Sequence, residues 1–194
     1  MILIPAYLPP ISYFKSFINK SEVSFLCQAS YKKQTFRNRC VIYSANGRLK
    51  LTIPISKYKI KQNVGHIMIH NAMPWQKNHW KSIKTAYNSS PFFEHYKDDI
   101  RPFFIEEQKF LYDFNLKLIV QILNMLDMNI KVKEVNIIDN LPEIENMLNP
   151  KKELTKSVPY NQVFQNKNGF QSDLSIIDLL FNLGPESSSY IKSL

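Results

Sequence analysis

The stretch with the greatest potential for binding chemistry is residues 31–40, Tyr-Lys-Lys-Gln-Thr-Phe-Arg-Asn-Arg-Cys. Its basic side chains are Lys32, Lys33, Arg37 and Arg39. The whole chain has four arginines, and two of them flank Asn38 here. A guanidinium offers a planar fork of donors that matches a phosphate or carboxylate and stacks on flat rings. We interpret this stretch as the floor of an anion-binding site, although it also fits a solvated basic turn that leads into a strand.

The positive charge of the chain is concentrated in its first half. The net charge is +9. Residues 1–97 hold 15 lysines and arginines against two acidic residues, whereas residues 98–194 hold 10 basic and 14 acidic residues. A positive field over one half favours an anionic partner, whether a nucleotide-linked metabolite, a nucleic acid or a membrane surface. A lysine-rich composition that only keeps the protein in solution would give the same imbalance.

Two further side chains are suited to proton transfer. His79 lies in a predicted helix, and it shares one face with Trp75 and Ile83. It could carry a proton near neutral pH or pack at the edge of the core. Asp178 lies within an apolar helical segment, where a carboxylate is costly to bury unless it is paired. We expect it to find a basic partner among the four cations of residues 31–40, unless it faces solvent.

Several familiar catalytic patterns are absent from the sequence. It has no Gly-rich phosphate loop, no cysteine pair at metal-binding spacing, no Gly-x-Ser-x-Gly elbow and no dinucleotide fingerprint. These absences argue against ATPases, zinc enzymes, that class of hydrolase and nicotinamide enzymes, so we predict no metal and no cofactor. An enzyme whose site is assembled from distant segments stays possible.

The expected location is the cytoplasm. The two cysteines, Cys27 and Cys40, give no disulfide framework, and a reduced compartment is then the default. No apolar run approaches the roughly 20 residues that span a bilayer. The apolar stretch at residues 1–5 is too short for a signal peptide, and no basic residues precede it.

The elements that position these side chains begin with a β-rich, basic part at about residues 1–70. Apolar runs predict strands at residues 1–5, 23–26, 41–43, 49–53 and 66–70. The spacing of Ile11, Phe14 and Ile18 predicts a short helix between the first two strands, which gives a βαβ start. Asn46-Gly47 is the strongest short hairpin signal, and it is predicted to join the strands at residues 41–43 and 49–53 as a hairpin.

The part from about residue 71 to residue 194 is predicted to be mostly helical. Helical spacing indicates helices at residues 75–87, 92–96, 105–126 and 174–181. Asn71 is the expected cap of the first, and Ser172 or Asp173 that of the last. An extended segment at residues 130–135 and an acidic surface connection at 139–145 lie between them. We predict one mixed α/β domain over residues 1–194, α+β-like, in which helices pack on an N-terminal mixed sheet.

Blocks spread from the first residues to the last ten carry a family resemblance. They are Tyr7-Leu8-Pro9, Tyr13-Phe14, residues 31–39, Asn46-Gly47, residues 51–54, Trp75-Gln76-Lys77, His79-Trp80, Ile83, Ala86-Tyr87, Gln162-Val163-Phe164, Gly169-Phe170, residues 174–182 and Gly184-Pro185. Together they resemble the WbqC-like family, and closely its members from the Bacteroidetes. Three positions depart from many relatives: Ile4 replaces a glutamine, Pro10 replaces a tryptophan, and Cys27 stands where acidic residues are frequent. Any chemistry of those groups in relatives would be lost here or performed by other residues.

The resemblance implies a biosynthetic process but does not define a reaction. The family is named from clusters that build bacterial surface polysaccharides, O-antigen included. The resemblance therefore implies a protein that binds a nucleotide-activated or amino sugar, with acyl or aminoacyl transfer as a suitable reaction. A nucleic-acid-binding module using the same basic half, or a scaffold for another enzyme, is the alternative.

Each candidate residue has a role in this hypothesis. Arg37 and Arg39, with Lys32, Lys33 and Asn38, would hold a diphosphate. The rings of Tyr7, Tyr13 and Trp75 would stack on a base or a sugar. His79 would be the acid or base, and Asp178 its organiser or a second carboxylate. We expect guanidinium groups from the first half and the Asp178 carboxylate to meet around one pocket.

Overall fold

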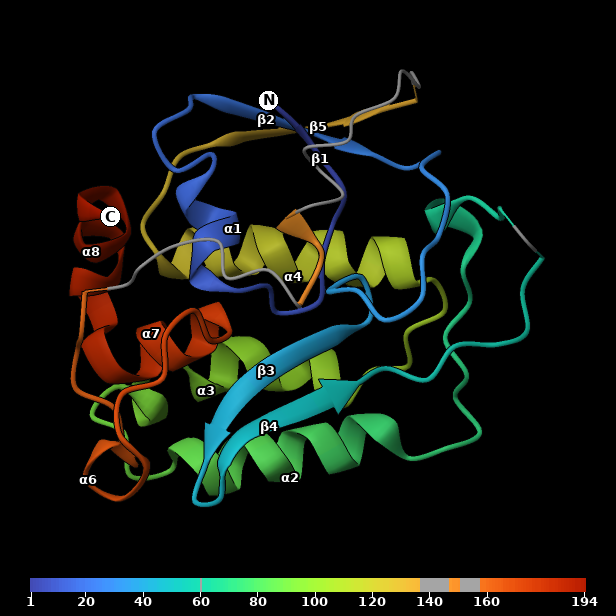
Figure 1. The fold of residues 1–194 in the computed structure, drawn as a ribbon. Helices are drawn as coiled ribbons and strands as arrows, with labels where there is room; N and C mark the ends of the chain where they lie inside the picture. The colour runs from blue at the N-terminus through green and yellow to red at the C-terminus, as the bar shows by residue number, and fades with distance from the viewer. Residues whose placement is uncertain (60, 137–146, 151–157) are drawn as a thin grey trace.

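The structure is a computed structural model that describes residues 1–59, 61–136, 147–150 and 158–194. A parallel sheet with the strand order β1-β2-β5 lies at the top of Figure 1. Its strands are β1 (Ile2–Leu3), β2 (Glu22–Leu26) and β5 (Lys131–Val135). Helix α1 (Ile11–Lys15) connects β1 to β2, which confirms the predicted βαβ start. β5 pairs with β2 in parallel from Glu22 opposite Lys131 to Leu26 opposite Val135.

The predicted hairpin is present as a separate two-stranded sheet. Strands β3 (Arg39–Ser44) and β4 (Gly47–Thr52) pair antiparallel, with Arg39 opposite Thr52. Gly47 has a φ of 92°, which glycine adopts without a steric penalty. The mixed α/β class is therefore confirmed, with its strands divided between a parallel sheet and a hairpin.

The strand predicted at residues 66–70 is not formed as a regular strand. A 3₁₀ turn, η1 (Val64–His66), leads into this segment, and only isolated bridges follow, between Ile55 and Ile69 and between Met68 and Phe110. The alternation itself is real, because Ile67 and Ile69 are buried while His66, Met68 and His70 are exposed. The segment makes single bridges on two sides but no continuous ladder. The alternating pattern therefore predicted correctly which side chains are buried, but not that the backbone would form a regular strand.

The helices follow in chain order. They are α2 (Trp75–Tyr87), α3 (Phe93–Ile100), η2 (Arg101–Phe104), α4 (Leu111–Met125), α6 (Gln165–Asn168), α7 (Ile176–Leu183), η3 (Gly184–Glu186) and α8 (Ser187–Ser193). The bounds predicted for α2 are confirmed. Helix α4 begins six residues later than predicted, because Phe110 is extended and pairs with Met68.

The expected helix caps are wrong. Pro74 is the N-cap of α2, and the Asn71 side chain instead donates to the Gln108 carbonyl at 2.8 Å and accepts from Trp75 Nε1 at 3.1 Å. Ser175 is the N-cap of α7. The Asp173 carboxylate accepts from the backbone and the hydroxyl of Ser12 at 2.9 and 2.8 Å. The side chains of Asn71 and Asp173 therefore make tertiary contacts, which a rule based on the local sequence cannot predict.

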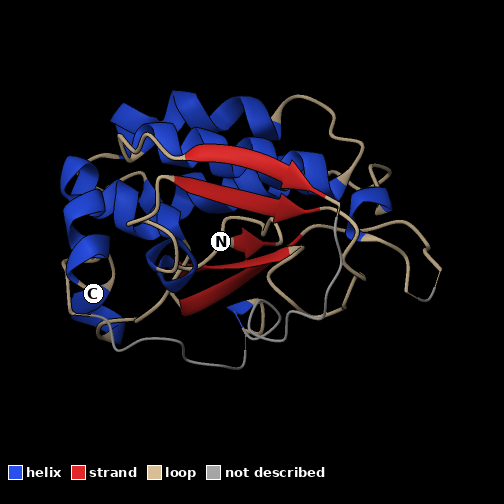
Figure 2. Cartoon of the chain, turned by 90° about the horizontal axis from the view of Figure 1, so that it is seen from above, coloured by secondary structure: helices blue, strands red, loops and turns tan. Residues whose placement is uncertain are grey.

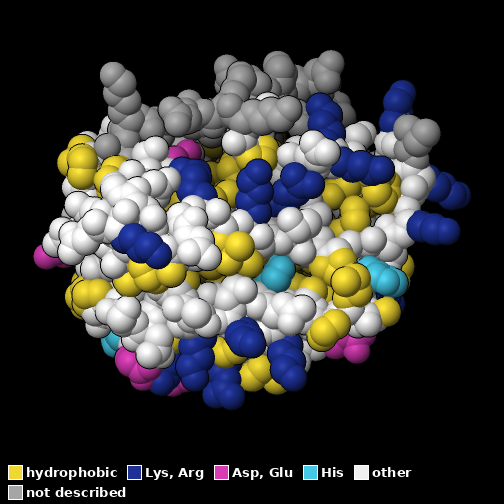
Figure 3. Space-filling model, turned by 60° about the horizontal axis from the view of Figure 1, so that its bottom comes forward, with side chains coloured by type: hydrophobic (Ala, Val, Ile, Leu, Met, Phe, Trp, Pro, Cys, Tyr) yellow, Lys and Arg dark blue, Asp and Glu magenta, His cyan; other side chains and the backbone are white. Residues whose placement is uncertain are grey.

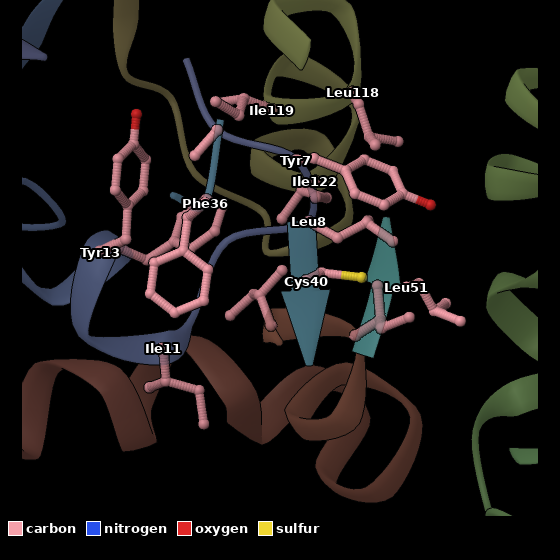
Figure 4. Packing of buried hydrophobic residues seen from close by; sticks show 14 of the residues in the cluster. Tyr7, Leu8, Ile11, Tyr13, Phe36, Cys40, Leu51, Leu118, Ile119 and Ile122 are labelled. Atoms are coloured by element: carbon pink, nitrogen blue, oxygen red, sulfur yellow. The ribbon is translucent and has the colours of Figure 1, made fainter. Parts of the chain in front are cut away.

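One buried cluster draws on both parts of the chain. Helix α4 runs beneath the parallel sheet in Figure 1, and Figure 2 shows helices along one side of the strands. In Figure 4, Leu118, Ile119 and Ile122 of α4 lie near Tyr7, Leu8 and hairpin residues Cys40 and Leu51. Helix α4 is therefore a core helix, with a buried face along its length. The expected acidic connection at 139–145 lies outside the described residues.

Candidate functional site

An open hollow of about 810 Å³ lies beside the start of β3. Its described lining is Tyr31, Lys33, Gln34, Asn38, Arg39, Ile55, Ser56, Lys57, Tyr58 and Lys61, and we call it the basic pocket. Four of these side chains are cationic, and none of the described lining residues is acidic. The volume lies in the range of small-molecule sites, about 300–1,000 Å³. Figure 3 shows one face of the molecule on which lysine and arginine gather and acidic side chains are sparse.

Two segments that are distant in sequence form the walls of the basic pocket. The backbone N–H of Tyr31 donates to the Gln62 carbonyl at 2.9 Å, and Ser30 and Asn63 form a bridge. The rings of Tyr31 and Tyr58 pack edge to face with their centroids 5.0 Å apart. Lys33 Nζ lies 5.5 Å from the centroid of the Tyr58 ring. These contacts place lysines from both segments around one space.

The floor of the basic pocket is fixed to the hairpin. Asn38 is buried, and its side-chain Nδ2 donates to the Ile53 carbonyl at 2.9 Å. The backbone carbonyl of Asn38 accepts from the Ile53 N–H at 2.8 Å. Asn38 Oδ1 and Arg39 Nε are buried atoms with no hydrogen-bond partner among the described residues. Buried polar atoms are normally paired. Both atoms are closed to solvent, so a ligand in the hollow would meet other parts of the partly exposed Arg39 side chain.

Tyr31 contributes a neutral hydroxyl to this pocket. Burial raises the pKa of Tyr31 to about 12, nearby Tyr58 adds to the rise, and the guanidinium groups of Arg37 and Arg39 oppose it. The hydroxyl therefore stays protonated at neutral pH and can donate or accept a hydrogen bond. The tyrosines add polar and aromatic contacts without cancelling the positive charge.

The two arginines of residues 31–40 have different environments. Arg39 lines the basic pocket and is partly exposed, whereas Arg37 is fully buried. Arg37 Nη1 donates to Thr35 Oγ1 at 3.3 Å, and the Arg37 carbonyl accepts from Asn115 Nδ2 at 2.7 Å. Neither Arg37 nor Lys32 belongs to the described lining of the pocket. Of the predicted anion-binding residues, the structure thus brings Lys33, Asn38 and Arg39 together.

Tyr7, Trp75 and His79 form a separate buried cluster. The Tyr7 hydroxyl lies 2.8 Å from His79 Nδ1, and the Trp75 ring packs edge to face on His79 with centroids 5.3 Å apart. Phe114 packs against both Tyr7 and Trp75, at 5.9 and 5.6 Å. Tyr13 is also buried, and its hydroxyl donates to the Ile4 carbonyl at 2.8 Å. These rings are packed by protein atoms, and none belongs to the described lining of the basic pocket.

His79 is neutral at physiological pH. Burial lowers its pKa to about 4, and a hydrogen bond to the backbone of Thr52 opposes part of that change. A bond that raises the pKa is one in which the ring N–H donates, so Nδ1 is left to accept from the Tyr7 hydroxyl. Both ring nitrogens are then engaged within the protein.

Asp178 is held by three neutral donors in place of the expected basic partner. Its carboxylate accepts from the hydroxyls of Tyr87 at 2.9 Å and Tyr160 at 2.6 Å, and from Gln162 Nε2 at 2.9 Å. Burial raises the pKa of Asp178 to about 6, and the three hydrogen bonds oppose that rise. Asp178 is absent from the described lining of the basic pocket, so the structure does not bring it together with Arg39 there.

His79 and Asp178 do not form an acid–base pair through a shared hydrogen bond. Tyr87, which donates to Asp178, lies eight residues after His79 on α2. At 1.5 Å per residue this is roughly 12 Å along the helix. The Tyr87 hydroxyl also accepts from the Tyr43 N–H at 3.0 Å, so this network ties α7 to α2 and β3.

Some lining residues were not among the predicted site residues. They include Lys57, Tyr58 and Lys61. The sequence signal is a tyrosine next to lysines, because Tyr58 lies between two lysines and Tyr31 is followed by two. No pattern in the sequence indicates that the two segments meet, because isolated backbone contacts join them.

Two broader findings concern the described residues alone. No three histidine, cysteine, aspartate or glutamate side chains gather there in a way that could hold a metal ion. Within the same residues, no helix is both long enough and apolar enough to cross a bilayer.

Comparison with known proteins establishes the family. The sequence profile of the WbqC-like protein family matches residues 5–157.

The chain belongs to the WbqC-like protein family.

The matched range includes both walls of the basic pocket and the His79 cluster, whereas Asp178 and α7 lie beyond it. A relative in Mycobacterium tuberculosis, the uncharacterized protein Rv1507c, is 24% identical over 218 residues that cover 96% of this chain and 94% of the relative. No solved structure matches the chain.

The three departures from the family pattern lie away from the basic pocket. Ile4 is buried in the core, and Pro10 is the N-cap of α1. Cys27 is half-buried, and its Sγ lies 3.1 Å from Asn136 Oδ1. None of them belongs to the described lining of that pocket.

Proposed function

We propose that this WbqC-like protein binds a nucleotide-linked sugar through its diphosphate in the basic pocket, as part of the synthesis of bacterial surface polysaccharides. The observation that carries the proposal is the lining of that pocket: Lys33, Arg39, Lys57 and Lys61 surround one hollow whose described lining has no carboxylate. The cytoplasmic location expected from the sequence belongs to the same proposal.

The balance of charges favours an anionic ligand. Like charges that share a small space repel one another, and a bound diphosphate would replace that repulsion with attraction. The partly exposed Arg39 side chain lines the hollow, and its guanidinium offers paired donors for phosphate oxygens. Tyr58 adds a ring face on which a base or a sugar could stack.

Binding has stronger support than a particular reaction. Acyl or aminoacyl transfer suits a protein that binds an activated or amino sugar. The roles of His79 and Asp178 as acid, base or organiser stay predictions, because the hydrogen bonds of both groups lie within the protein. The proposed ligand contacts are those of Lys33, Asn38 and Arg39, joined by the lysines at 57 and 61.

Calorimetric titration of UDP-glucose and of inorganic pyrophosphate into the full chain tests the proposal. We expect the Arg39→Gln variant to bind both at least about tenfold more weakly, since a hydrogen bond to a charged group contributes about 1.5–3 kcal/mol. The matched control is Lys84→Gln, which removes an exposed charge on α2 and should leave the affinities within about twofold. Equal weakening by both substitutions would contradict a specific site.

A salt titration separates this proposal from a nucleic-acid-binding module. Affinity for a nucleic acid falls steeply with salt, by a log–log slope of about −0.7 per neutralised phosphate of a single strand. We expect a shallow slope for UDP-glucose and no comparable stabilisation by a short oligonucleotide. Thermal stabilisation by oligonucleotides without any by the nucleotide sugar would reject the proposal, because a ligand stabilises the folded state that binds it.

A further inference from the structure

A smaller hollow of about 200 Å³ adjoins the basic pocket. The two spaces share Gln34 and Arg39. The other described lining residues of the smaller hollow, which we call the side pocket, are Phe36, Val41, Arg48, Lys50 and Pro150. Arg39 therefore lies where the two pockets meet.

The pairing of the hairpin explains why cations gather in the side pocket. Val41 lies opposite Lys50, and Tyr43 lies opposite Arg48. Side chains alternate between the two faces of a strand, so Lys50 and Arg48 share a face with Val41, and Arg39 joins them two residues before Val41. Leu49 and Leu51 point to the other face and pack in the core.

The charges of the side pocket are unbalanced. Arg39, Arg48 and Lys50 contribute three positive groups, and the described lining contains no carboxylate. Like charges that line one small space repel one another, so their proximity favours a bound anion. Arg48 is held in place because its Nη1 donates to the Ser172 carbonyl at 3.0 Å.

The size and the walls of the side pocket limit what it can hold. A volume of about 200 Å³ equals the space of about seven liquid waters at roughly 30 Å³ each. This suits one ring with a small substituent and not a nucleotide. Phe36, Val41 and Pro150 offer apolar surface for the carbon face of such a ring, and a carboxylate is a small anionic group that fits an arginine fork.

We propose that the side pocket binds a carboxylate on the sugar of the ligand whose diphosphate occupies the basic pocket. The substrate class is then a nucleoside diphosphate linked to an acidic sugar of the uronic acid type. This inference rests on the proposed function and adds the part of the ligand that lies beyond the phosphates. Arg39 bridges the two anionic groups.

The test compares UDP-glucuronate, UDP-glucose and UDP by calorimetric titration of the full chain. We expect the unaltered protein to bind UDP-glucuronate at least tenfold more tightly than UDP-glucose. Lys50→Gln and Arg48→Gln should reduce that preference to about twofold or less, while the affinity for UDP-glucose stays within twofold. Lys84→Gln is the matched control and should keep the preference. Thermal unfolding of each variant checks that it is folded, and Arg48→Lys should restore part of the preference.

The outcomes separate this inference from the proposed function. If UDP-glucose and UDP-glucuronate bind equally well, the acidic-sugar inference is wrong while the diphosphate site stands. The same holds if the preference survives both Lys50→Gln and Arg48→Gln. If none of the three ligands binds, both proposals are overturned.

Discussion

At the scale of single residues, the most unusual group is the buried carboxylate of Asp178. It is fully buried and is held by two tyrosine hydroxyls and one amide, and none of its hydrogen-bond partners in the described part of the chain is a cation. Burial disfavours the charged form more strongly than these neutral donors favour it, which raises the pKa to about 6 from its ordinary value of 3.8. The carboxylate therefore opposes folding once it is ionised.

The sign of its effect on stability follows from proton counts. Below pH 3.8 Asp178 is protonated in both the folded and the unfolded chain. Between pH 3.8 and about 6 the folded chain retains the proton that the unfolded chain loses, so the free energy of unfolding falls as pH rises. At about 1.4 kcal/mol per pH unit, the total loss is on the order of 3 kcal/mol.

We predict that Asp178→Asn removes this pH dependence. Asparagine has a similar shape and cannot ionise, so the stability of the variant relative to the unaltered protein should rise between pH 4 and pH 7. Urea unfolding at several pH values measures the difference. The control is Asp98→Asn, at an exposed position, which should show a nearly constant difference. A constant difference for Asp178→Asn as well would mean that the buried carboxyl does not titrate in this range.

At the scale of elements, the end of α7 depends on a glycine. Gly184 has a φ of 57°, and a Cβ built there would lie 2.5 Å from Cδ1 of Phe92. The Phe92 N–H donates to the carbonyl of Phe181 in α7 at 3.0 Å, so the ring is held against this helix end. Position 184 therefore requires both a left-handed backbone and the absence of a side chain.

We predict that Gly184→Ala destabilises the protein more than a matched substitution does. Gly169→Ala is the control, because Gly169 also has a positive φ of 71° but has open space where a Cβ would lie. The control should lose about 1–3 kcal/mol through backbone strain. Gly184→Ala should lose a further 1–3 kcal/mol, roughly, through overpacking against Phe92. Equal losses in urea unfolding would show that the Phe92 ring moves aside.

Local signals predicted the elements better than the contacts between them. The helix at 75–87 and the hairpin at Asn46-Gly47 were predictable because their patterns are complete within a few residues. The role of Asn71 was not, since its side chain bonds to Gln108, 37 residues away. The same limit applies to the site: residues 31–40 indicated an anion site, but only the fold brings Lys57 and Lys61 to it.

At the scale of the whole molecule, the two parts of the chain share one buried cluster. It includes Tyr7 and Ile42 from the β-rich part, and Leu118 and Phe181 from the helical part. Neither part would keep its apolar surface covered without the other. A single domain, as the length and composition suggest, is consistent with this packing.

We predict that the full chain unfolds in a single cooperative transition. Far-UV circular dichroism reports helices and strands together, while tryptophan fluorescence reports Trp75 and Trp80 of α2. In urea the two signals should give the same midpoint. Separate midpoints would contradict the single-domain prediction and would indicate that the β-rich and helical parts unfold independently.

The position of β5 has a consequence for how the protein is made. The central strand β2 pairs with β5, and Glu22 and its partner Lys131 are more than one hundred residues apart. Loop closure over such a distance makes parallel pairing slow. During synthesis on a ribosome β2 therefore emerges long before its second neighbour exists, and one edge of it stays open for pairing with other chains. Efficient production should depend on the chaperones that shield nascent strands.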